Sequence, residues 1–362
     1  MKINNILTDS VFIETPIEEE KPKENQLNYV EIKAKTNITL KTKVTPITPN
    51  IWISETVVCT VGGVLVVSGQ KKAGKSQGML AIITTALNKK PNPEKSIGII
   101  AKYTEKKIVY FDTEMLEADT QSFITKAMKI SDIKEEPTNL IMQNLRQLSL
   151  IERKFFLEKF LENEKDIDYL LIDGVADFFG SVNEEEKARE FIDMIFSKKE
   201  KDTTVIFAIH EGKDGNGATG HLGQIIERKC SGTIAFFKDR KLKVHTIKCK
   251  MVRHGEDFED IKFMFTKEHF FPVLLNADQL ASIQEKSEET KSDELRKVIT
   301  QTFATTMNLS KEDVIQGFLN YDNTIDKSTK IESQKALARR RYKKSEELGF
   351  IKENNKIVTI II

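Results

Sequence analysis

Residues that could bind phosphate stand together from Gly69 to Ser76, in the order Gly-Gln-Lys-Lys-Ala-Gly-Lys-Ser. This is the G-x-x-x-x-G-K-S pattern of a P-loop, in which backbone N–H groups surround phosphate oxygens and the lysine reaches the β- and γ-phosphates. The hydroxyl of Ser76 is of the kind that ligates Mg²⁺ in such loops. The predicted nucleotide-binding residues are Gly69, Gln70, Lys71, Lys72, Ala73, Gly74, Lys75, Ser76 and Gln77. The pattern predicts a site for a nucleoside triphosphate with Mg²⁺.

The P-loop follows the apolar run Val64–Val67, a plausible buried strand, and two other apolar runs end in acids. The run Tyr169–Ile172 ends in Asp173, which could support Mg²⁺ through its water shell. The run Val109–Phe111 is followed by acids that include Glu114, which could position and activate water for attack on the γ-phosphate. The alternatives are a core strand that happens to end in Asp and a turn with solvated acids. For Glu114 the sequence leaves both interpretations open.

A fourth apolar run, Val205–Ile209, ends in His210. A polar donor there could sense the γ-phosphate and pass its presence to the Gly-rich segment 211–220, whose composition suits a mobile element. The alternative is a histidine whose hydrogen bonds are satisfied at the end of a strand.

Cationic residues gather at the end of a late strand. Lys248, Lys250 and Arg253 lie far from the P-loop in sequence. They could reach a neighbouring subunit's nucleotide and stabilise charge on the phosphoryl group that is transferred. The alternative is an exposed basic strand end.

These residues need strands that end at one edge of a sheet, and the hydrophobic pattern predicts such a framework. The predicted strands are 64–68, 107–112, 139–143, 168–173, 203–209, 232–237, 242–249 and 260–266. The strongest predicted helices are 76–88, 150–163 and 185–198. Their alternation indicates an α/β fold with a largely parallel, doubly wound sheet.

The composition is that of an ordinary soluble chain. The 362 residues include 31% charged and 39% hydrophobic residues, and the net charge of +1 means that any nucleic-acid surface must be local. Cys59, Cys230 and Cys249 lie far apart, which argues against a zinc site or disulfides and for a reducing, cytoplasmic location. No apolar run approaches the length needed to span a membrane, and the first residues lack a signal-peptide core.

The chain divides into four parts. Residues 1–45 are predicted to be a mostly disordered arm, 46–277 the α/β domain, 278–293 a polar, helix-like linker and 294–362 a small C-terminal domain.

The C-terminal domain has the pattern of a winged helix. Helices are predicted at Glu294–Met307, Ser310–Leu319 and Ser328–Leu348, followed by a hairpin around Glu353-Asn354-Asn355. The third helix is rich in basic residues, which suits phosphate contacts. Its predicted DNA-binding residues are Lys335, Arg339, Arg340 and Lys343, beside Lys330, Arg341 and Lys344. The alternatives are a solvated face or a protein-binding module.

The four strand-end motifs, in this order, resemble the RecA-type ATPase core of RecA and DnaB-like replicative helicases. The resemblance covers about residues 45–270 and is closest to RepA-like helicases of plasmids and mobilizable elements. It rests on three segments beside the P-loop, which are Phe111-Asp112-Thr113-Glu114, Ile172-Asp173-Gly174-Val175-Ala176-Asp177 and Gly220-His221-Leu222-Gly223.

The resemblance implies roles for single residues. Glu114 matches the catalytic glutamate, Asp173 the aspartate that supports Mg²⁺ and His210 the γ-phosphate sensor. Arg253 resembles the arginine finger of hexameric helicases, and Lys250 its lysine companion. The DNA-facing loops would be 174–187 and 214–223.

The chain departs from this pattern at three places. The loop 214–223 lacks a dense basic or aromatic set. The first loop contains Glu184-Glu185-Glu186, which would repel phosphate. The lysine spacing is looser than in DnaB-like proteins, so Lys248 remains a second candidate for the companion.

The expected function is that of an ATP- and Mg²⁺-dependent DNA helicase or translocase. It would act as a hexameric ring on single-stranded DNA in replication of a plasmid, phage or mobile element, with a primase or replication initiator as a further partner. The alternative is an ATP-switched DNA-binding regulator with slow turnover that acts through the winged helix. A strand-exchange filament would need a polymerising arm, for which residues 1–45 give little support.

Overall fold

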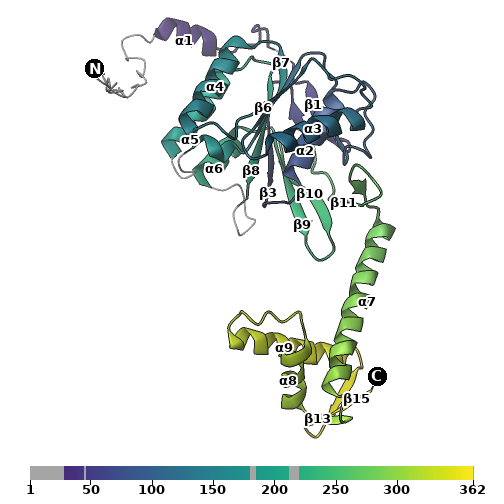
Figure 1. Ribbon diagram of the computed structural model, residues 1–362. Coiled ribbons are helices and arrows are strands. Elements are labelled where there is room, and N and C mark those ends of the chain that lie inside the picture. Colours follow the sequence, from purple (N-terminus) through teal and green to yellow (C-terminus); the bar gives the residue numbers. More distant parts are fainter. Residues whose placement is uncertain (1–27, 45, 180–184, 212–219, 362) are drawn as a thin grey trace, which may run out of the picture. The chain divides into compact units, whose positions relative to one another are not determined.

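The computed structural model describes residues 28–44, 46–179, 185–211 and 220–361 (Figure 1). The chain forms two units, one that ends at Ile47 and one that begins at Thr48. In the first unit, a short helix, α1 (Tyr29–Thr36), is capped by the Asn28 side chain. This helix was not predicted. Most of the arm expected to be disordered, residues 1–27, lies outside the described residues.

A large mixed sheet forms the centre of the second unit. Within the described residues it has nine strands, in the order β12-β11-β10-β9-β3-β8-β7-β5-β6. The strands are β3 (Val64–Gly69), β5 (Lys107–Asp112), β6 (Leu140–Asn144), β7 (Ile167–Asp173), β8 (Thr204–His210), β9 (Gly232–Asp239), β10 (Val244–Val252), β11 (Ile261–Met264) and β12 (Val273–Leu274). The six from β9 to β6 pair in parallel, and β10 to β12 extend the sheet in antiparallel fashion. The prediction of a largely parallel α/β sheet is thus confirmed.

The register brings the ends of the parallel strands level with one another. Gly69 is paired with His210, and Asp112 with Asp173. These strands run in the same direction and their last residues are paired, so the four chemistry-bearing strand ends meet at the carboxyl edge of the sheet. The predicted clustering of these ends therefore follows from strand pairing alone.

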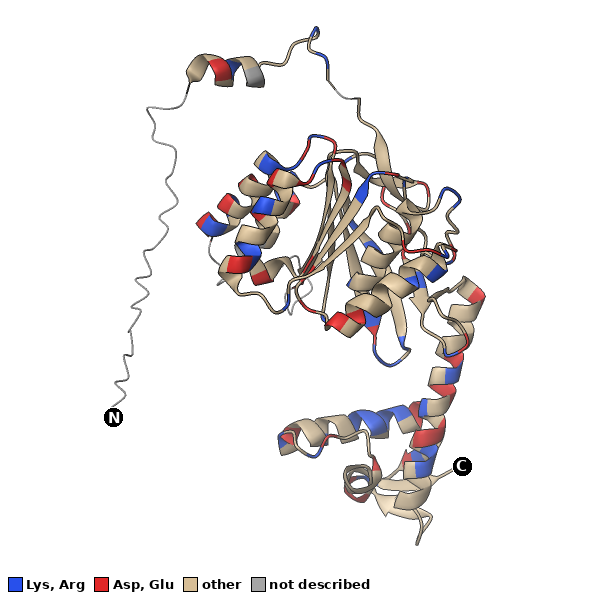
Figure 2. Cartoon of the chain, turned by 45° about the horizontal axis from the view of Figure 1, so that its top comes forward, with Lys and Arg blue, Asp and Glu red and all other residues tan. Residues whose placement is uncertain are grey.

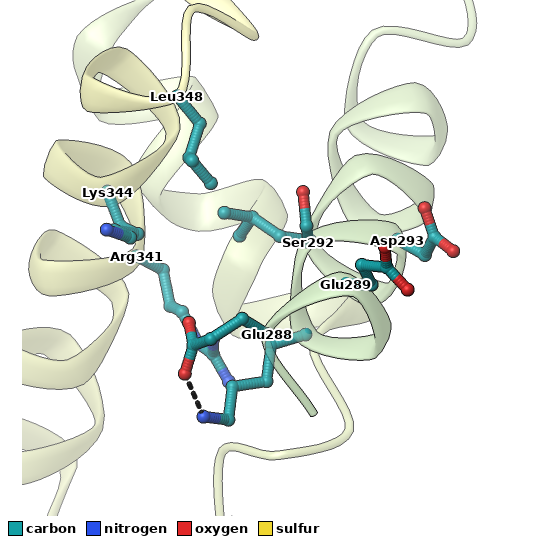
Figure 3. Close-up of a pocket in the computed structure, with 9 residues that line it drawn as sticks. Glu288, Glu289, Ser292, Asp293, Arg341, Lys344 and Leu348 are labelled. Atoms are coloured by element: carbon teal, nitrogen blue, oxygen red, sulfur yellow. Dashed lines mark hydrogen bonds and ion pairs between the residues drawn. The ribbon is translucent and has the colours of Figure 1, made fainter. Parts of the chain in front are cut away.

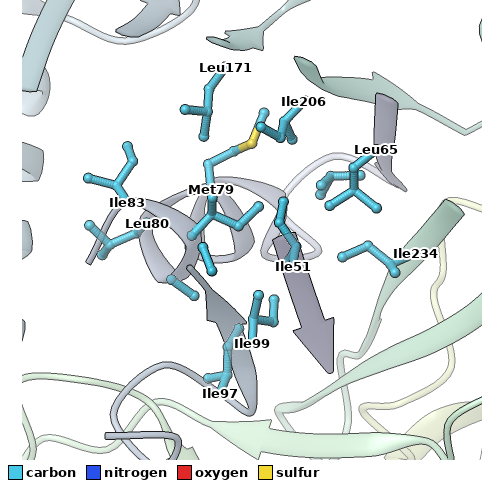
Figure 4. Packing of buried hydrophobic residues seen from close by; sticks show 14 of the residues in the cluster. Ile51, Leu65, Met79, Leu80, Ile83, Ile97, Ile99, Leu171, Ile206 and Ile234 are labelled. Carbon is cyan, nitrogen blue, oxygen red and sulfur yellow. The ribbon is translucent and has the colours of Figure 1, made fainter. Parts of the chain in front are cut away.

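Helices cover both faces of the sheet, as the burial of β3 on both sides requires. The helices are α2 (Lys75–Ala86), α3 (Glu117–Ile130), α4 (Leu150–Asn163), α5 (Glu185–Lys198) and α6 (Gly220–Lys229). One apolar core includes α2 and α3, and the other includes α4, α5 and α6. Figure 4 shows Met79 and Ile83 of α2 among Leu65, Leu171 and Ile206 of the strands.

A second, three-stranded sheet lies in the same core as α2. Its antiparallel strands, in the order β2-β1-β4, are β1 (Pro49–Ile53), β2 (Thr56–Thr60) and β4 (Ile99–Ala101). Ile51 and Ile99 are fully buried against the helix. The sequence did not predict these short strands.

The C-terminal part has its own apolar core. It comprises α7 (Ala277–Thr302), β13 (Asn308–Ser310), α8 (Lys311–Tyr321), α9 (Ile331–Glu347), β14 (Ile351–Asn354) and β15 (Ile357–Ile360). The three strands form a sheet in the order β13-β15-β14. The expected linker 278–293 and the helix after it are one continuous helix, α7, which begins with a capping box formed by Asn276 and Gln279.

Within the described ranges, no helix has both the length and the apolar character that a membrane span needs.

We expect Leu171→Ala to lower the free energy of unfolding by about 3 kcal/mol, because it leaves a cavity between the sheet and α2. Ile151→Ala, at a side chain that is 80% exposed, is the matched control and should change stability by less than about 0.5 kcal/mol. Urea unfolding followed by circular dichroism measures both. Equal effects of the two substitutions would contradict the assigned core.

Candidate nucleotide site

A cavity of about 890 Å³ opens at the carboxyl edge of the parallel strands. It brings together the predicted residues Lys71, Lys72, Gly74, Lys75, Ser76, Gln77, Glu114, Asp173 and His210. Residues from four strand ends thus share one space, although up to 139 positions separate them (from Lys71 to His210).

The P-loop reaches this cavity in a conformation that needs glycine. Gly74 has φ +113° and stands before the first turn of α2, where no side chain caps the helix. Gly69 has φ +150°, and a Cβ there would lie 2.4 Å from the Phe236 carbonyl oxygen. The uncapped first turn leaves its backbone N–H groups directed to where an anion would bind.

A chain of contacts joins Lys75 to Glu114 through His210. The Lys75 Nζ lies 3.0 Å from His210 Nδ1, and the His210 Nε2 lies 3.1 Å from Glu114 Oε1. An ammonium group only donates, so Nδ1 accepts and Nε2 carries the proton that it donates to the carboxylate. Lys75 also donates to the Gly69 and Gln70 carbonyls, at 3.1 and 3.3 Å.

Burial and neighbouring charges shift the pKa values of Lys75 and Glu114. Burial lowers the pKa of Lys75, while the carboxylates of Asp173 and Glu114 oppose that shift. The hydrogen bond from His210 lowers the pKa of Glu114, which favours the ionised carboxylate.

Asp173 and Ser76 form a second cluster. The Ser76 Oγ donates to Asp173 Oδ2 at 3.1 Å, and the hydroxyl of the buried Tyr110 donates to the same oxygen at 2.8 Å. Asp173 is 5% exposed, and burial raises its pKa above the ordinary value.

This hydroxyl and carboxylate suit Mg²⁺, which takes one or two protein ligands and completes its shell with water and phosphate oxygens. Among the described residues, no cluster of three or more His, Cys, Asp or Glu side chains could hold a metal ion.

Asp112 has a different role from its neighbour Glu114. It is fully buried and accepts hydrogen bonds from the backbone N–H groups of Glu114 and Met115, at 2.9 and 3.1 Å. It also accepts from the Thr120 hydroxyl of α3. Asp112 therefore fixes the turn that presents Glu114, a positioning role that the sequence did not predict.

The late cationic residues lie outside this cavity. Lys248 pairs with Asp260 at 3.2 Å, and Lys250 Nζ lies 4.0 Å from the buried carboxylate of Glu211 in its own chain. Arg253 donates to the Arg228 carbonyl at 2.6 Å.

Arg253 follows Val252, whose strand partner is Gly232 at the start of β9. Phe236, four residues further along β9, is the partner of Gly69. The backbone N–H of Arg253 donates to the carbonyl of Ser231, five residues before Phe236, so the Arg253 backbone lies about 16 Å from the level of the P-loop, toward the amino edge of the parallel strands.

Several lining residues were not among the predicted site residues. They are Leu80, Met115, Asp119, Ser122, Phe123, Lys126, Ala176, Asp177, Lys238, His245 and Phe265. Those of α3 come from an unpredicted helix. Lys238 and His245 face each other on β9 and β10, and only the antiparallel pairing of these strands brings them to the cavity.

The predicted DNA-binding residues share the exposed side of α9. Lys335, Arg339, Arg340 and Lys343 are exposed, while Ala338, Tyr342 and Ser345 are buried in the C-terminal core. Figure 2 shows the basic stretch along this helix.

Arg341 and Lys344 also face α7, and Arg340 lines a neighbouring cavity with them. Arg341 and Lys344 line a cavity of about 670 Å³ between α9 and α7, opposite Glu288 and Ser292 (Figure 3). Arg341 is paired with Asp322 at 3.1 Å, so it is not among the residues on the exposed side.

The two expected DNA-facing loops are described only in part. Residues 180–184 of the first and 214–219 of the second lie outside the described residues. The described start of the first loop forms a 3₁₀ turn, Val175–Phe178.

Solved structures similar to this chain include a recombinase and a KaiC-like protein. A crystal structure of the RadB recombinase matches with a TM-score of 0.41 and 11% identity, covering 57% of this chain and 88% of that protein. A KaiC-like protein from the hyperthermophilic archaeon Pyrococcus horikoshii OT3 matches with a TM-score of 0.43 and 12% identity, covering 65% and 100%. No family model and no curated protein matches the sequence. Both TM-scores are below 0.5, so the nucleotide site stands on the distances within this chain.

We expect Asp173→Asn to stabilise the nucleotide-free protein at pH 7. Burial raises the folded-state pKa of Asp173 above its ordinary value of 3.8, so ionisation of this group increasingly destabilises the folded state as the pH rises above that value. Asn removes this charge and can still accept a hydrogen bond. Its gain in urea midpoint should shrink as the pH falls toward 4.

Asp193→Asn, at an exposed carboxylate, is the control for this measurement. A loss of stability in Asp173→Asn at pH 7 would show that the ionised carboxylate of Asp173 does not destabilise the folded protein.

Proposed function

We propose that this chain is a Mg²⁺-dependent ATPase of the RecA type. The observation that carries the proposal is the convergence of Lys75, Ser76, Asp173, Glu114 and His210 on one cavity at the carboxyl edge of a parallel sheet. A P-loop alone binds phosphate. A P-loop beside a carboxylate for the cation and a second carboxylate for water has the parts needed for hydrolysis.

The phosphates of ATP would be held by the N–H groups of residues 69–77 and by Lys75. In the chain as described, the ammonium of Lys75 donates to two loop carbonyls and lies against His210, so a γ-phosphate would exchange these contacts for stronger, charge-assisted ones. Ser76 and Asp173 would hold Mg²⁺, which would neutralise charge on the phosphate oxygens.

Glu114 is the proposed base or water-orienting group. It is half-exposed to the cavity, and the hydrogen bond from His210 fixes its carboxylate. His210 contacts both Lys75 and Glu114, so loss of the γ-phosphate would change the hydrogen bonds of both of its ring nitrogens. His210 lies directly before segment 211–220, so a change in its contacts could be passed to that segment.

The motor form of the proposal is a hexameric ring with nucleotide at subunit interfaces. Arg253 lies toward the amino edge of the sheet, away from its own P-loop, so as an arginine finger it would act on a neighbour's nucleotide. Lys250, held near Glu211, is its proposed companion. The ring would move on single-stranded DNA during replication of a plasmid, phage or mobile element, with a primase or initiator as partner.

The C-terminal part, from about residue 294, is proposed to be a winged helix that binds DNA. Three helices with a three-stranded antiparallel sheet around one core support this assignment. The exposed side of α9 carries Lys335, Arg339, Arg340 and Lys343, for which the described residues offer no acidic partner within ion-pair distance.

An ATP-switched DNA-binding regulator is the second candidate. The same C-terminal core favours it, because a basic module with its own core can bind DNA without a motor. DNA-insensitive, slow hydrolysis would distinguish this candidate from the helicase.

We expect Glu114→Gln to lower the ATP hydrolysis rate at least 100-fold and to retain ATP binding, because it removes the proton acceptor and leaves the phosphate-binding groups in place. Lys75→Ala should lose binding and hydrolysis together. Phosphate release with and without single-stranded DNA, and binding of a fluorescent ATP analogue, measure these effects. Normal turnover in Glu114→Gln would refute the assignment of Glu114, and stimulation of the wild type by DNA would favour the motor.

Replacing Lys335, Arg339, Arg340 and Lys343 together by Ala should weaken DNA binding and reduce the slope of log affinity against log salt by up to about 3, because up to four phosphate contacts are lost. Basal ATP hydrolysis should stay unchanged. The control removes four exposed lysines of the α/β domain, Lys89, Lys90, Lys134 and Lys165. An unchanged salt slope in the α9 variant would favour a protein-docking module.

A further inference from the structure

A histidine from the antiparallel edge of the sheet touches the P-loop backbone. The Nδ1 of His245, on β10, lies 2.7 Å from the carbonyl oxygen of Ala73. Ala73 is the residue before Gly74, at the turn that opens α2. His245 is separated from this loop by 172 positions and by the whole of β9 in the sheet.

The chemistry of this contact fixes the tautomer of His245. A carbonyl oxygen only accepts, so Nδ1 carries the proton and donates it. The ring is 4% exposed, and its burial lowers the pKa of His245. The positive charge of Lys238, its strand partner, also lowers the pKa of His245. The neutral ring with its proton on Nδ1 is therefore the form that holds the loop at neutral pH.

Aromatic side chains fix the orientation of the ring. His245 stacks on Phe263, with ring centres 5.1 Å apart and planes at 19°, and meets the edge of Phe265 at 5.2 Å. The loop lies directly on this support, since a Cβ at Gly74 would be 3.3 Å from His245 Nδ1 and 3.4 Å from Phe263.

We infer that His245 is a positioning residue for the nucleotide. It fixes the direction of the Ala73 carbonyl and so keeps the following N–H groups of the loop aimed at the phosphates. This inference deepens the proposed function and rests on it for the identity of the ligand. Its structural part, restraint of the loop by His245, does not depend on which ligand binds.

The test compares two substitutions at the same position. His245→Leu keeps an apolar side chain and removes the donor, which leaves the buried Ala73 carbonyl without its partner. His245→Asn places an amide nitrogen at the same distance from the backbone as Nδ1, so it can restore the hydrogen bond while it loses the stacking. His269→Leu, at an exposed histidine, is the control.

We expect His245→Leu to bind ATP about tenfold more weakly than the wild type and to show faster amide exchange at residues 70–76 in the nucleotide-free protein. His245→Asn should return both values to within about threefold of the wild type, and the control should change neither. Equal defects in the Leu and Asn variants, or no defect in the Leu variant, would overturn the inference. If the wild type bound no ATP but the exchange pattern held, the proposed function would fail and the loop restraint would stand.

Discussion

The site depends on keeping a buried ammonium and a buried carboxylate together inside an α/β core. Lys75 and Asp173 are each less than one-tenth exposed, so little of either side chain is open to solvent. Taking such groups out of water is costly unless hydrogen bonds and opposite charges replace the lost solvent. The two loop carbonyls, His210, Tyr110 and Ser76 provide this replacement. The two buried charges therefore determine how these hydrogen-bond partners are placed around the cavity before any ligand binds.

This arrangement serves binding more than stability. The pKa of Lys75 is lowered and the pKa of Asp173 is raised, so for both groups burial disfavours the charged form. A phosphate beside the one and a cation beside the other would favour the charged forms, so part of the binding energy would come from relieving this penalty. Strained electrostatics of this kind are common where a protein binds a charged ligand. The large apolar cores on both faces of the sheet offset the cost.

Much of the central sheet could be predicted from the sequence, because each parallel strand is a continuous apolar run that ends in a polar residue. Such runs fix Lys75, Glu114, Asp173 and His210 at one edge without knowledge of any contact. The role of Asp112 could not be predicted, because an acid that caps a turn and an acid that faces a ligand look alike in sequence. His245 could not be found either, since it reaches the P-loop only through strand pairing and aromatic stacking. The small sheet with β1, β2 and β4 was missed because its strands are short and lack a regular pattern.

The continuity of α7 has a mechanical consequence for the C-terminal part. A helix of 26 residues is about 39 Å long, and about 27 Å of it precedes Leu295, the first of its residues in the C-terminal core. Residues 278–293 contain no glycine or proline, so this stretch acts as a rod and not as a hinge. Rotation of the C-terminal part must therefore arise near Asn276, where the capping box starts the helix. A turn of 10° there would displace the start of the C-terminal core by about 5 Å, which makes α7 a lever that enlarges small movements at its base.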